Sequence, residues 1–236
     1  MYVQIISTMK NESQNLNSFI DLIQDLHAIH MFAGEAIVVN NGSTDDTDSV
    51  IATLPDLPFV KFLVNPKNST YADGLERAIS EAVAPYVLIV PCDLQFDKYD
   101  ILNLLHVFYT QLAYSSSNKI VVISDRKIRL DGSFNKFRGY LWRFIVCKVL
   151  SLNSDIDPAS QLRIIPNPKG IKFTSRNFLW DIESLIWALK TVPAYIVVGV
   201  KFHPRVYGVS NSSSKVFRSA LTALIGLNAI RSCYKD

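Results

Sequence analysis

Polar side chains that could bind a metal ion follow one of the apolar segments of this sequence. Asp93 and Gln95 lie two residues apart, directly after the apolar run of residues 86–90. Carboxylate and amide oxygens at this spacing can bind a hard cation such as Mg²⁺ or Mn²⁺. An Asp in this place also commonly caps the next helix, so the pair alone leaves both interpretations open.

A second polar stretch, residues 40–47, follows the apolar run of residues 36–39. Asn41 and Gly42 form a turn pair, and the Ser, Thr and Asp residues after them can cap a helix. The N-terminus of such a helix could also face an anionic ligand. The stretch therefore predicts a strand-turn-helix junction, with anion binding as the functional alternative.

The second half of the chain carries carboxylates and arginines that could take part in group transfer. Asp157 precedes a short apolar stretch, residues 162–165, and Asp181 and Glu183 lie in an otherwise apolar helix. Arg205 follows the last predicted strand, where a guanidinium can bind phosphate oxygens in a bidentate manner. Further cations that could join it are Arg126, Arg138 and Lys215. Ion pairs and solvated surface charges also explain these residues.

Apolar runs of strand length alternate with helical patterns, which is typical of an α/β fold. The predicted strands cover residues 3–6, 36–39, 59–64, 86–90, 120–123 and 195–200. The predicted helices cover residues 16–27, 101–108, 139–150, 178–190 and 214–231. The strand runs are nearly continuously apolar and do not alternate, as in a parallel sheet that is covered on both faces. Because ligands of such sheets bind beyond the carboxyl ends of the strands, the polar residues after the first, second and fourth strands should converge on one edge.

The composition fits a single globular domain and excludes several classes of protein. The chain has 236 residues, of which 49% are hydrophobic and 19% charged, and a net charge of +3. So mild a positive charge gives no reason to expect nucleic acid binding. Cys92, Cys147 and Cys233 are widely spaced and odd in number, so we expect neither a disulfide framework nor a zinc site, and a reducing compartment. We also expect no signal peptide and no membrane-spanning segment.

In their order and spacing, the motifs resemble those of family 2 glycosyltransferases with the GT-A fold, most closely the dolichyl-phosphate and polyprenyl-phosphate sugar synthases. The resemblance covers most of the chain. It rests on residues 8–12, 38–47, 71–78, 91–95, 157–163, 180–183 and 202–210. The chain departs from the family at Asn40 and Asn41, which replace aspartates, at Pro91, which replaces the first acidic residue of the metal motif, and at Gln161, which replaces a glycine.

The resemblance implies a single GT-A domain with a mostly parallel sheet flanked by helices. Residues 1–124 would form a nucleotide-binding half, residues 125–213 an acceptor half, and residues 214–231 a C-terminal amphipathic helix. The implied nucleotide-binding residues are Thr8, Met9, Glu12, Asn40, Asn41, Ser43, Asp73, Cys92 and Asp93. Asp93 and Gln95 inherit the metal-binding positions. Candidates for binding phosphate or the acceptor are Arg126, Arg138, Arg163, Arg205, Ser210 and Lys215, and the catalytic candidates are Asp157, Glu183 and Asp181.

The implied reaction moves a sugar from a nucleoside diphosphate sugar to a polyprenyl phosphate or a glycan, with inversion and with Mg²⁺ or Mn²⁺ on the diphosphate. A sugar hydroxyl acceptor would need a general base, with Asp157 as first choice and Glu183 or Asp181 as second, whereas a polyprenyl phosphate is already ionised. The two asparagines and Pro91 leave a second interpretation, a degenerate GT-A module that binds a nucleotide or a partner without turnover. The absence of glycine from residues 7–13 argues against nicotinamide-dependent and nucleotidyl-transferring enzymes.

The C-terminal helix has an apolar stripe between cations, among them Lys215, Arg218 and Arg231. Such a helix can pack on the sheet or lie at a membrane interface. Together with the resemblance to lipid-linked sugar synthases, this pattern leads us to expect a cytoplasmic protein in reversible contact with the cytoplasmic face of a membrane.

Overall fold

One seven-stranded sheet, parallel except for a single strand among those described, forms the centre of the molecule. The computed structural model describes residues 2–114, 119–207 and 216–234. The strands are β1 (Val3–Met9), β2 (Ala36–Asn40), β3 (Val60–Val64), β4 (Tyr86–Ile89), β5 (Val121–Arg129), β6 (Arg163–Pro166) and β7 (Tyr195–Phe202). Their order across the sheet is β3-β2-β1-β4-β6-β5-β7, and β6 runs antiparallel to both β4 and β5. The predicted α/β fold with a mostly parallel sheet is confirmed.

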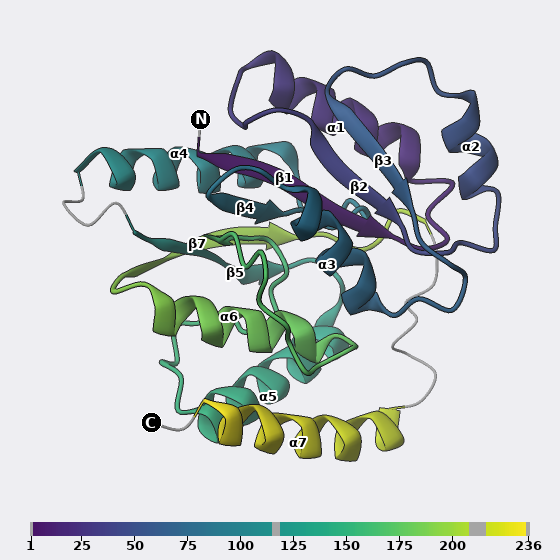
Figure 1. The fold of residues 1–236 in the computed structure, drawn as a ribbon. Coiled ribbons are helices and arrows are strands. Elements are labelled where there is room, and N and C mark those ends of the chain that lie inside the picture. Colours follow the sequence, from purple (N-terminus) through teal and green to yellow (C-terminus); the bar gives the residue numbers. More distant parts are fainter. Residues whose placement is uncertain (1, 115–118, 208–215, 235–236) are drawn as a thin grey trace.

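Helices cover both faces of this sheet (Figure 1). They are α1 (Leu16–Ala28), α2 (Thr47–Thr53), α3 (Tyr71–Glu81), α4 (Lys98–Tyr114), α5 (Ser133–Leu150), α6 (Leu179–Thr191) and α7 (Val216–Cys233). Helices α1 and α4 contribute buried side chains to the core on one face, and α3 and α6 contribute to the core on the other. The two cores explain why the strand sequences are mostly apolar on both faces.

Alternation of side chains along each strand divides neighbouring residues between the two cores. Ile5 lies in the core formed with α1 and α4, and Ile6 lies in the core formed with α3 and α6. Leu88 and Ile89 of β4 divide in the same way. Because each strand residue points to the face opposite its neighbour, a strand that is covered on both sides is mostly apolar on both faces.

Helices α5 and α7 form an additional layer on α6, as Figure 1 shows below the sheet. Leu227 and Ile230 of α7 are buried with Val146 of α5 and with Ile182 and Ile186 of α6. Leu227 and Ile230 of the C-terminal helix therefore pack on two helices, whereas Leu224 and Ile225 are exposed.

Several elements differ from their sequence-based prediction, and β5 and α4 are both longer than predicted. The apolar stretch at residues 162–165 forms the antiparallel strand β6, which is four residues long and too short to show a strand period by itself. Helix α5 begins at Ser133, although the pattern predicted a start near residue 139. Aromatic residues in its first turns conceal the amphipathic period, because they are exposed to solvent.

Candidate active site

The loops after β1 and β2 are joined to each other by hydrogen bonds at the carboxyl edge of the sheet. Asn11 adopts a left-handed backbone conformation, with φ +59°, and its Oδ1 accepts a hydrogen bond from the Thr44 N–H at 2.7 Å. The Asn11 N–H donates to Ser43 Oγ at 2.9 Å, and the Glu12 N–H donates to Thr47 Oγ1 at 3.2 Å. The predicted convergence of these polar residues on one edge is therefore present, and it fixes the position of Glu12.

The two asparagines after β2 hold their own turn. Asn40 is fully buried, its Oδ1 accepts hydrogen bonds from the Ser43 N–H and Oγ, and its Nδ2 donates to Asp48. Asn41 Nδ2 donates to the Thr70 carbonyl oxygen at 2.5 Å, and its Oδ1 accepts from Asn65 at 3.1 Å. An aspartate at position 40 would have no proton to donate to Asp48. The amide is thus the side chain that fits this turn.

Close packing of α3 against β1 shapes the floor beside this turn. A Cβ atom at Gly74 of α3 would overlap the side chain of Thr8. Met9, the next residue of β1, is 2% exposed, and Asp73 closes a capping box with Thr70 at the start of α3. Burial raises the pKa of Asp73, but hydrogen bonds from Thr70 and the adjacent Arg176 outweigh it and lower that pKa. Thr8 and Asp73 thus lie at the start of α3, whereas Met9 is buried in the core on the other face of the sheet.

Two carboxylates face one guanidinium at the centre of the same edge. Arg205, directly after β7, lies with Nη2 at 2.9 Å from Asp93 Oδ2 and with Nη1 at 3.6 Å from Glu12 Oε1. Burial raises the pKa of both carboxyls, and Arg205 lowers both values only in part. The three residues come from the ends of β1, β4 and β7. The two carboxylates therefore carry more negative charge than the single guanidinium of Arg205 can neutralise.

The loop that carries Asp93 is held in place by β7. Leu94 has a left-handed backbone, with φ +56°, and the Gln95 N–H donates to Asp93 Oδ1 at 3.3 Å. Gln95 Nε2 donates to the His203 carbonyl oxygen at 3.0 Å, and the His203 N–H donates to the Gln95 carbonyl oxygen at 2.9 Å. Cys92 contacts Ser7 Oγ at 2.9 Å, and burial raises the pKa of its thiol far above the usual range, so the thiol stays neutral.

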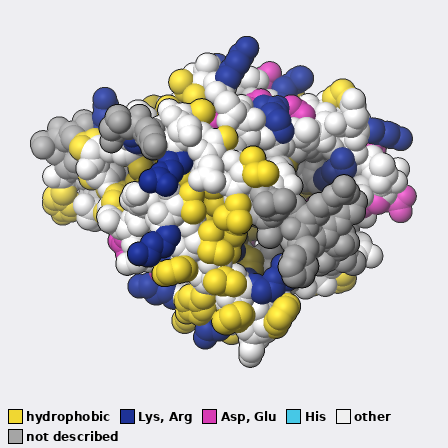
Figure 2. All heavy atoms as spheres, turned by 90° about the horizontal axis from the view of Figure 1, so that it is seen from below, with side chains coloured by type: hydrophobic (Ala, Val, Ile, Leu, Met, Phe, Trp, Pro, Cys, Tyr) yellow, Lys and Arg dark blue, Asp and Glu magenta, His cyan; other side chains and the backbone are white. Residues whose placement is uncertain are grey.

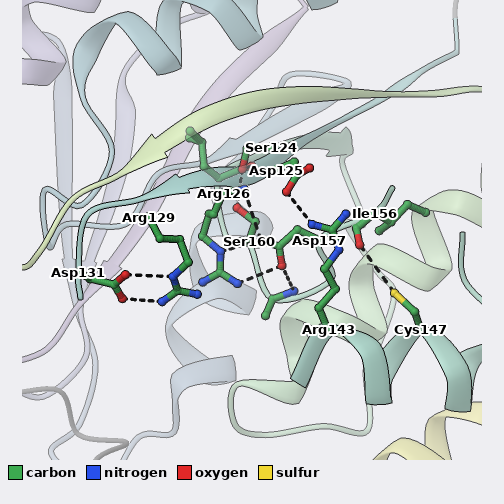
Figure 3. A network of polar contacts seen from close by, with 12 residues as sticks. Ser124, Asp125, Arg126, Arg129, Asp131, Arg143, Cys147, Ile156, Asp157 and Ser160 are labelled. Atoms are coloured by element: carbon green, nitrogen blue, oxygen red, sulfur yellow. Dashed lines mark hydrogen bonds and ion pairs between the residues drawn. The ribbon is translucent and has the colours of Figure 1, made fainter. Parts of the chain in front are cut away.

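Asp157 lies in a separate network of ion pairs at the end of β5 (Figure 3). Arg126 binds it in a bidentate manner, with Nε at 2.7 Å and Nη2 at 3.0 Å. Burial raises the pKa of Asp157, but the charges of Arg126 and Arg143 outweigh it and lower the pKa below its usual value. Arg143 binds Asp125 at 2.7 Å and the Ser154 carbonyl oxygen at 2.7 Å. Asp157 is thus ionised, and both of its carboxylate oxygens already accept hydrogen bonds from Arg126. Its lowered pKa makes it a weak base.

Residues 4–151 match glycosyl transferase family 2. The chain belongs to this family. No curated protein sequence matches it significantly. Two similar solved structures are of glucosyl-3-phosphoglycerate synthase from Mycobacterium tuberculosis. The complex with Mn²⁺, UDP and glucosyl-3-phosphoglycerate has a TM-score of 0.70 and 16% identity, over 97% of this chain and 80% of that one. The complex with Mn²⁺ and UDP-glucose has a TM-score of 0.71 and 15% identity, over 97% and 79%. At this identity the likeness shows the GT-A fold.

In this family 2 glycosyltransferase the two other candidate carboxylates, Asp181 and Glu183, are buried. Asp181 forms an ion pair with Arg163 at 2.9 Å, and both are buried, because β6 directs Arg163 into the core. Burial raises the pKa of Asp181. Glu183, 2% exposed, accepts hydrogen bonds from the backbone N–H groups of Thr174 and Ser175 at 2.9 and 2.8 Å. Asp181 and Arg163 are nevertheless buried next to the edge where Asp93 lies, because Arg163 stands opposite Ile89 at the end of β4. Tyr71 donates a hydrogen bond to Asp181 at 3.2 Å, and burial followed by the charge of Asp181 and, more weakly, that of Asp93 raises the pKa of Tyr71.

The remaining predicted residues of the glycosyltransferase are dispersed. Arg138 is exposed on α5, with its guanidinium 5.7 Å from the Phe134 ring centre. Ser210 and Lys215 lie outside the described residues. Within the described ranges, no cluster of three His, Cys, Asp or Glu side chains is arranged to hold a metal ion, and no helix is long and apolar enough to cross a membrane.

Sequence reasoning missed the direct pairing of Arg205 with Asp93 and Glu12, and the roles of Asp48 and Arg143. The sequence indicates Arg205 only as a candidate for binding phosphate or the acceptor, because nothing in the spacing shows that β7 ends beside the loops that carry Asp93 and Glu12. The signal that could have found Asp48 is its place in the first turn of the helix that residues 43–46 precede.

Proposed function

We propose that this glycosyltransferase moves a hexose from a nucleoside diphosphate sugar to an ionised phosphate acceptor, a polyprenyl phosphate, with inversion and with a divalent cation on the donor. The observation that carries the choice of acceptor is the state of the three candidate bases. Asp157, Asp181 and Glu183 are each already bound by partners, and the pKa of Asp157 is lowered. A glycan hydroxyl needs a base to remove its proton, whereas an ionised phosphate does not.

The donor would bind at the edge formed by Thr8, Glu12, Ser43 and Asp93. Its base would lie against the joined loops after β1 and β2, and its diphosphate would lie near Arg205. The support for this placement is that open α/β sheets bind ligands beyond the carboxyl ends of their strands. The buried amides of Asn40 and Asn41 would act there by holding the turn.

The residues present fit a divalent cation by their chemistry, because the carboxylates of Asp93 and Glu12 face each other across a single guanidinium, that of Arg205. Burial raises the pKa of both carboxyls. Asp93 would be the principal ligand, with Gln95 through Oε1 and with Glu12 beside it. Donor phosphate oxygens would complete the set, since Mg²⁺ usually takes one or two carboxylates and substrate phosphates. When bound, the cation supplies positive charge that stabilises the leaving diphosphate.

Arg205, Arg126 and Asp157 each have a part in the reaction. Arg205 exchanges its carboxylate partners for oxygens of the leaving diphosphate, to which a guanidinium can bind in a bidentate manner. The acceptor phosphate oxygen attacks the anomeric carbon from the face opposite the diphosphate, and this direction of attack inverts the configuration. Asp157 acts as a positioning residue that holds Arg126 towards the acceptor, and it serves as a base only for a hydroxyl acceptor. A lipid-borne acceptor places the reaction at the cytoplasmic face of a membrane.

A thermal-shift titration tests the donor site without any acceptor. UDP, GDP, CDP and TDP are each added with and without Mn²⁺ or Mg²⁺, since a ligand of the native state raises the apparent Tm. We expect a cation-dependent shift with one nucleotide, reduced in Asp93→Asn and kept in the matched surface variant Asp56→Asn. Transfer assays with the sugars of that nucleotide then compare a polyprenyl phosphate with neutral glycans. A shift without turnover of any donor would favour the degenerate binding module, which Pro91 and the two asparagines also suggest.

A further inference from the structure

The outward face of α5 is apolar, where a surface helix normally presents polar side chains. Its buried side chains, among them Val146 and Cys147, point towards the protein. The residues on the other side are exposed by between 50% and 73%. They are Phe134, Phe137, Tyr140, Leu141 and Phe144, and we call them the aromatic stripe. Their spacing of three, four and three residues along the helix, with Tyr140 alongside, places them on one side of it.

Cations accompany the aromatic stripe, and α5 contains no Asp or Glu. Lys136, Arg138 and Lys148 are exposed on the same helix. The Arg138 guanidinium lies 5.7 Å from the ring centre of Phe134, and Lys148 Nζ lies 6.0 Å from that of Phe144. In Figure 2, which looks onto the layer of α5 and α7, hydrophobic side chains form a continuous band with Lys and Arg at its borders.

A hollow of about 840 Å³ opens between α5 and β5, with two members of the stripe, Tyr140 and Phe144, in its lining. Lys127 and Lys148 also line it, with the paired guanidinium groups of Arg126 and Arg143. The exposed rings therefore lie next to a basic concave surface. An apolar stripe with cations along it and no acidic residue is the pattern of a helix that lies in the headgroup region of an anionic bilayer.

We propose that α5 docks the protein on an anionic membrane surface. The rings of the aromatic stripe enter the boundary between headgroups and acyl chains, and Lys136, Arg138 and Lys148 contact lipid phosphates. A second copy of the chain fits less well, because a two-fold interface would place this acid-free helix against itself, cation facing cation. The inference rests on the proposed lipid-linked acceptor for its purpose and on the residues of α5 for its evidence. It assigns membrane contact to α5, whereas the sequence pattern pointed to the C-terminal helix.

Flotation with vesicles of phosphatidylcholine, with and without phosphatidylglycerol, tests the proposal in the absence of donor. We expect the full chain to float with the anionic vesicles and much less with the neutral ones. The double variant Phe134→Ser, Phe137→Ser should lower the partition coefficient by about tenfold or more, since each ring buries a large apolar area. The matched control, Tyr99→Ser, removes a ring that is 74% exposed on α4 and should bind as the wild type does.

A charge variant gives an independent measurement if the ring variant does not fold, which circular dichroism reports. Lys136→Glu, Arg138→Glu should lower anionic-vesicle binding by about tenfold or more, because each basic residue near an anionic surface contributes about fivefold and each is reversed. Lys172→Glu, at an exposed site outside α5, is its control.

Several results would overturn the proposal. They are no flotation, equal flotation with both vesicle types, variants that bind as the wild type does, or a lipid-free dimer that the ring variant abolishes. The nucleotide thermal shift separates this failure from failure of the proposed function, because the donor site lies on other elements. If vesicle binding is absent but the nucleotide shift is present, only the proposal for α5 is wrong. If the nucleotide shift is absent but the protein floats, only the proposed transferase function is wrong.

Discussion

Asn40→Asp restores the residue that the family usually has at this position, and we expect it to destabilise this protein. The wild-type amide donates through Nδ2 to Asp48 and accepts from Ser43 through Oδ1. A carboxylate keeps the acceptor but places a second negative charge against Asp48. Two unit charges about 3 Å apart repel by about 1.4 to 5.5 kcal/mol as the effective dielectric constant falls from about 80 to about 20. Because Asp48 is exposed, we expect a value near the lower end, about 2 kcal/mol in the free energy of unfolding.

Urea denaturation of four proteins measures this interaction as a double-mutant cycle. The four are the wild type, Asn40→Asp, Asp48→Asn and the double variant, in which the amide introduced at position 48 can donate to the carboxylate introduced at position 40. The double variant should recover most of the lost stability. The cost of Asn40→Asp should also shrink below about pH 4, where one of the two carboxyls becomes protonated. An Asn40→Asp protein as stable as the wild type, or no recovery in the double variant, would refute the reasoning. A change in nucleotide preference at unchanged stability would instead assign Asn40 to the base.

Three further predictions concern other parts of the site. Asp93→Asn should lower turnover by about 10²-fold or more and weaken the cation-dependent thermal shift, since it removes a charge-stabilising ligand; full activity in a transfer assay would disprove the assignment. Gly74→Ala should cost about 1–3 kcal/mol by overlap with Thr8, although helix propensity alone would favour Ala by about 1 kcal/mol, so a higher Tm would contradict the packing. Asp157→Asn should cost about 3 kcal/mol at neutral pH, because it leaves Arg126 without its buried partner. The pKa of Asp157 in the folded protein is lowered from 3.8. The difference in unfolding free energy between the wild type and Asp157→Asn should therefore be fully present above that pH and disappear as the pH falls through the folded pKa. Acid titrations of the stability of both proteins would show this.

The sequence by itself determined the fold class and the edge of the sheet at which we propose the donor site. Continuously apolar strands such as residues 86–89 occur where both faces of a sheet are covered, so the pattern indicates a parallel sheet. The polar loops that hold Glu12 and Asp93 follow such strands directly, and the carboxyl ends of parallel strands share one edge. Both features depend on residues that are close together in the chain or that recur with a regular period, so they can be recognised in the sequence alone. The later family match agrees with the order of the motifs.

Only the tertiary structure determined which charged side chains form ion pairs. Arg205 is more than a hundred residues from Asp93 in sequence and reaches it because β7 ends beside the loop after β4. The same holds for the ion pairs Arg126–Asp157 and Arg163–Asp181. In each pair an arginine binds a carboxylate that the sequence offers as a candidate general base. Pairing between distant residues depends on strand order, and the order β4-β6-β5-β7 is not written in any local pattern. Likewise, the exposure of the rings on α5 follows from where α6 and α7 pack, since an apolar sequence alone predicts burial.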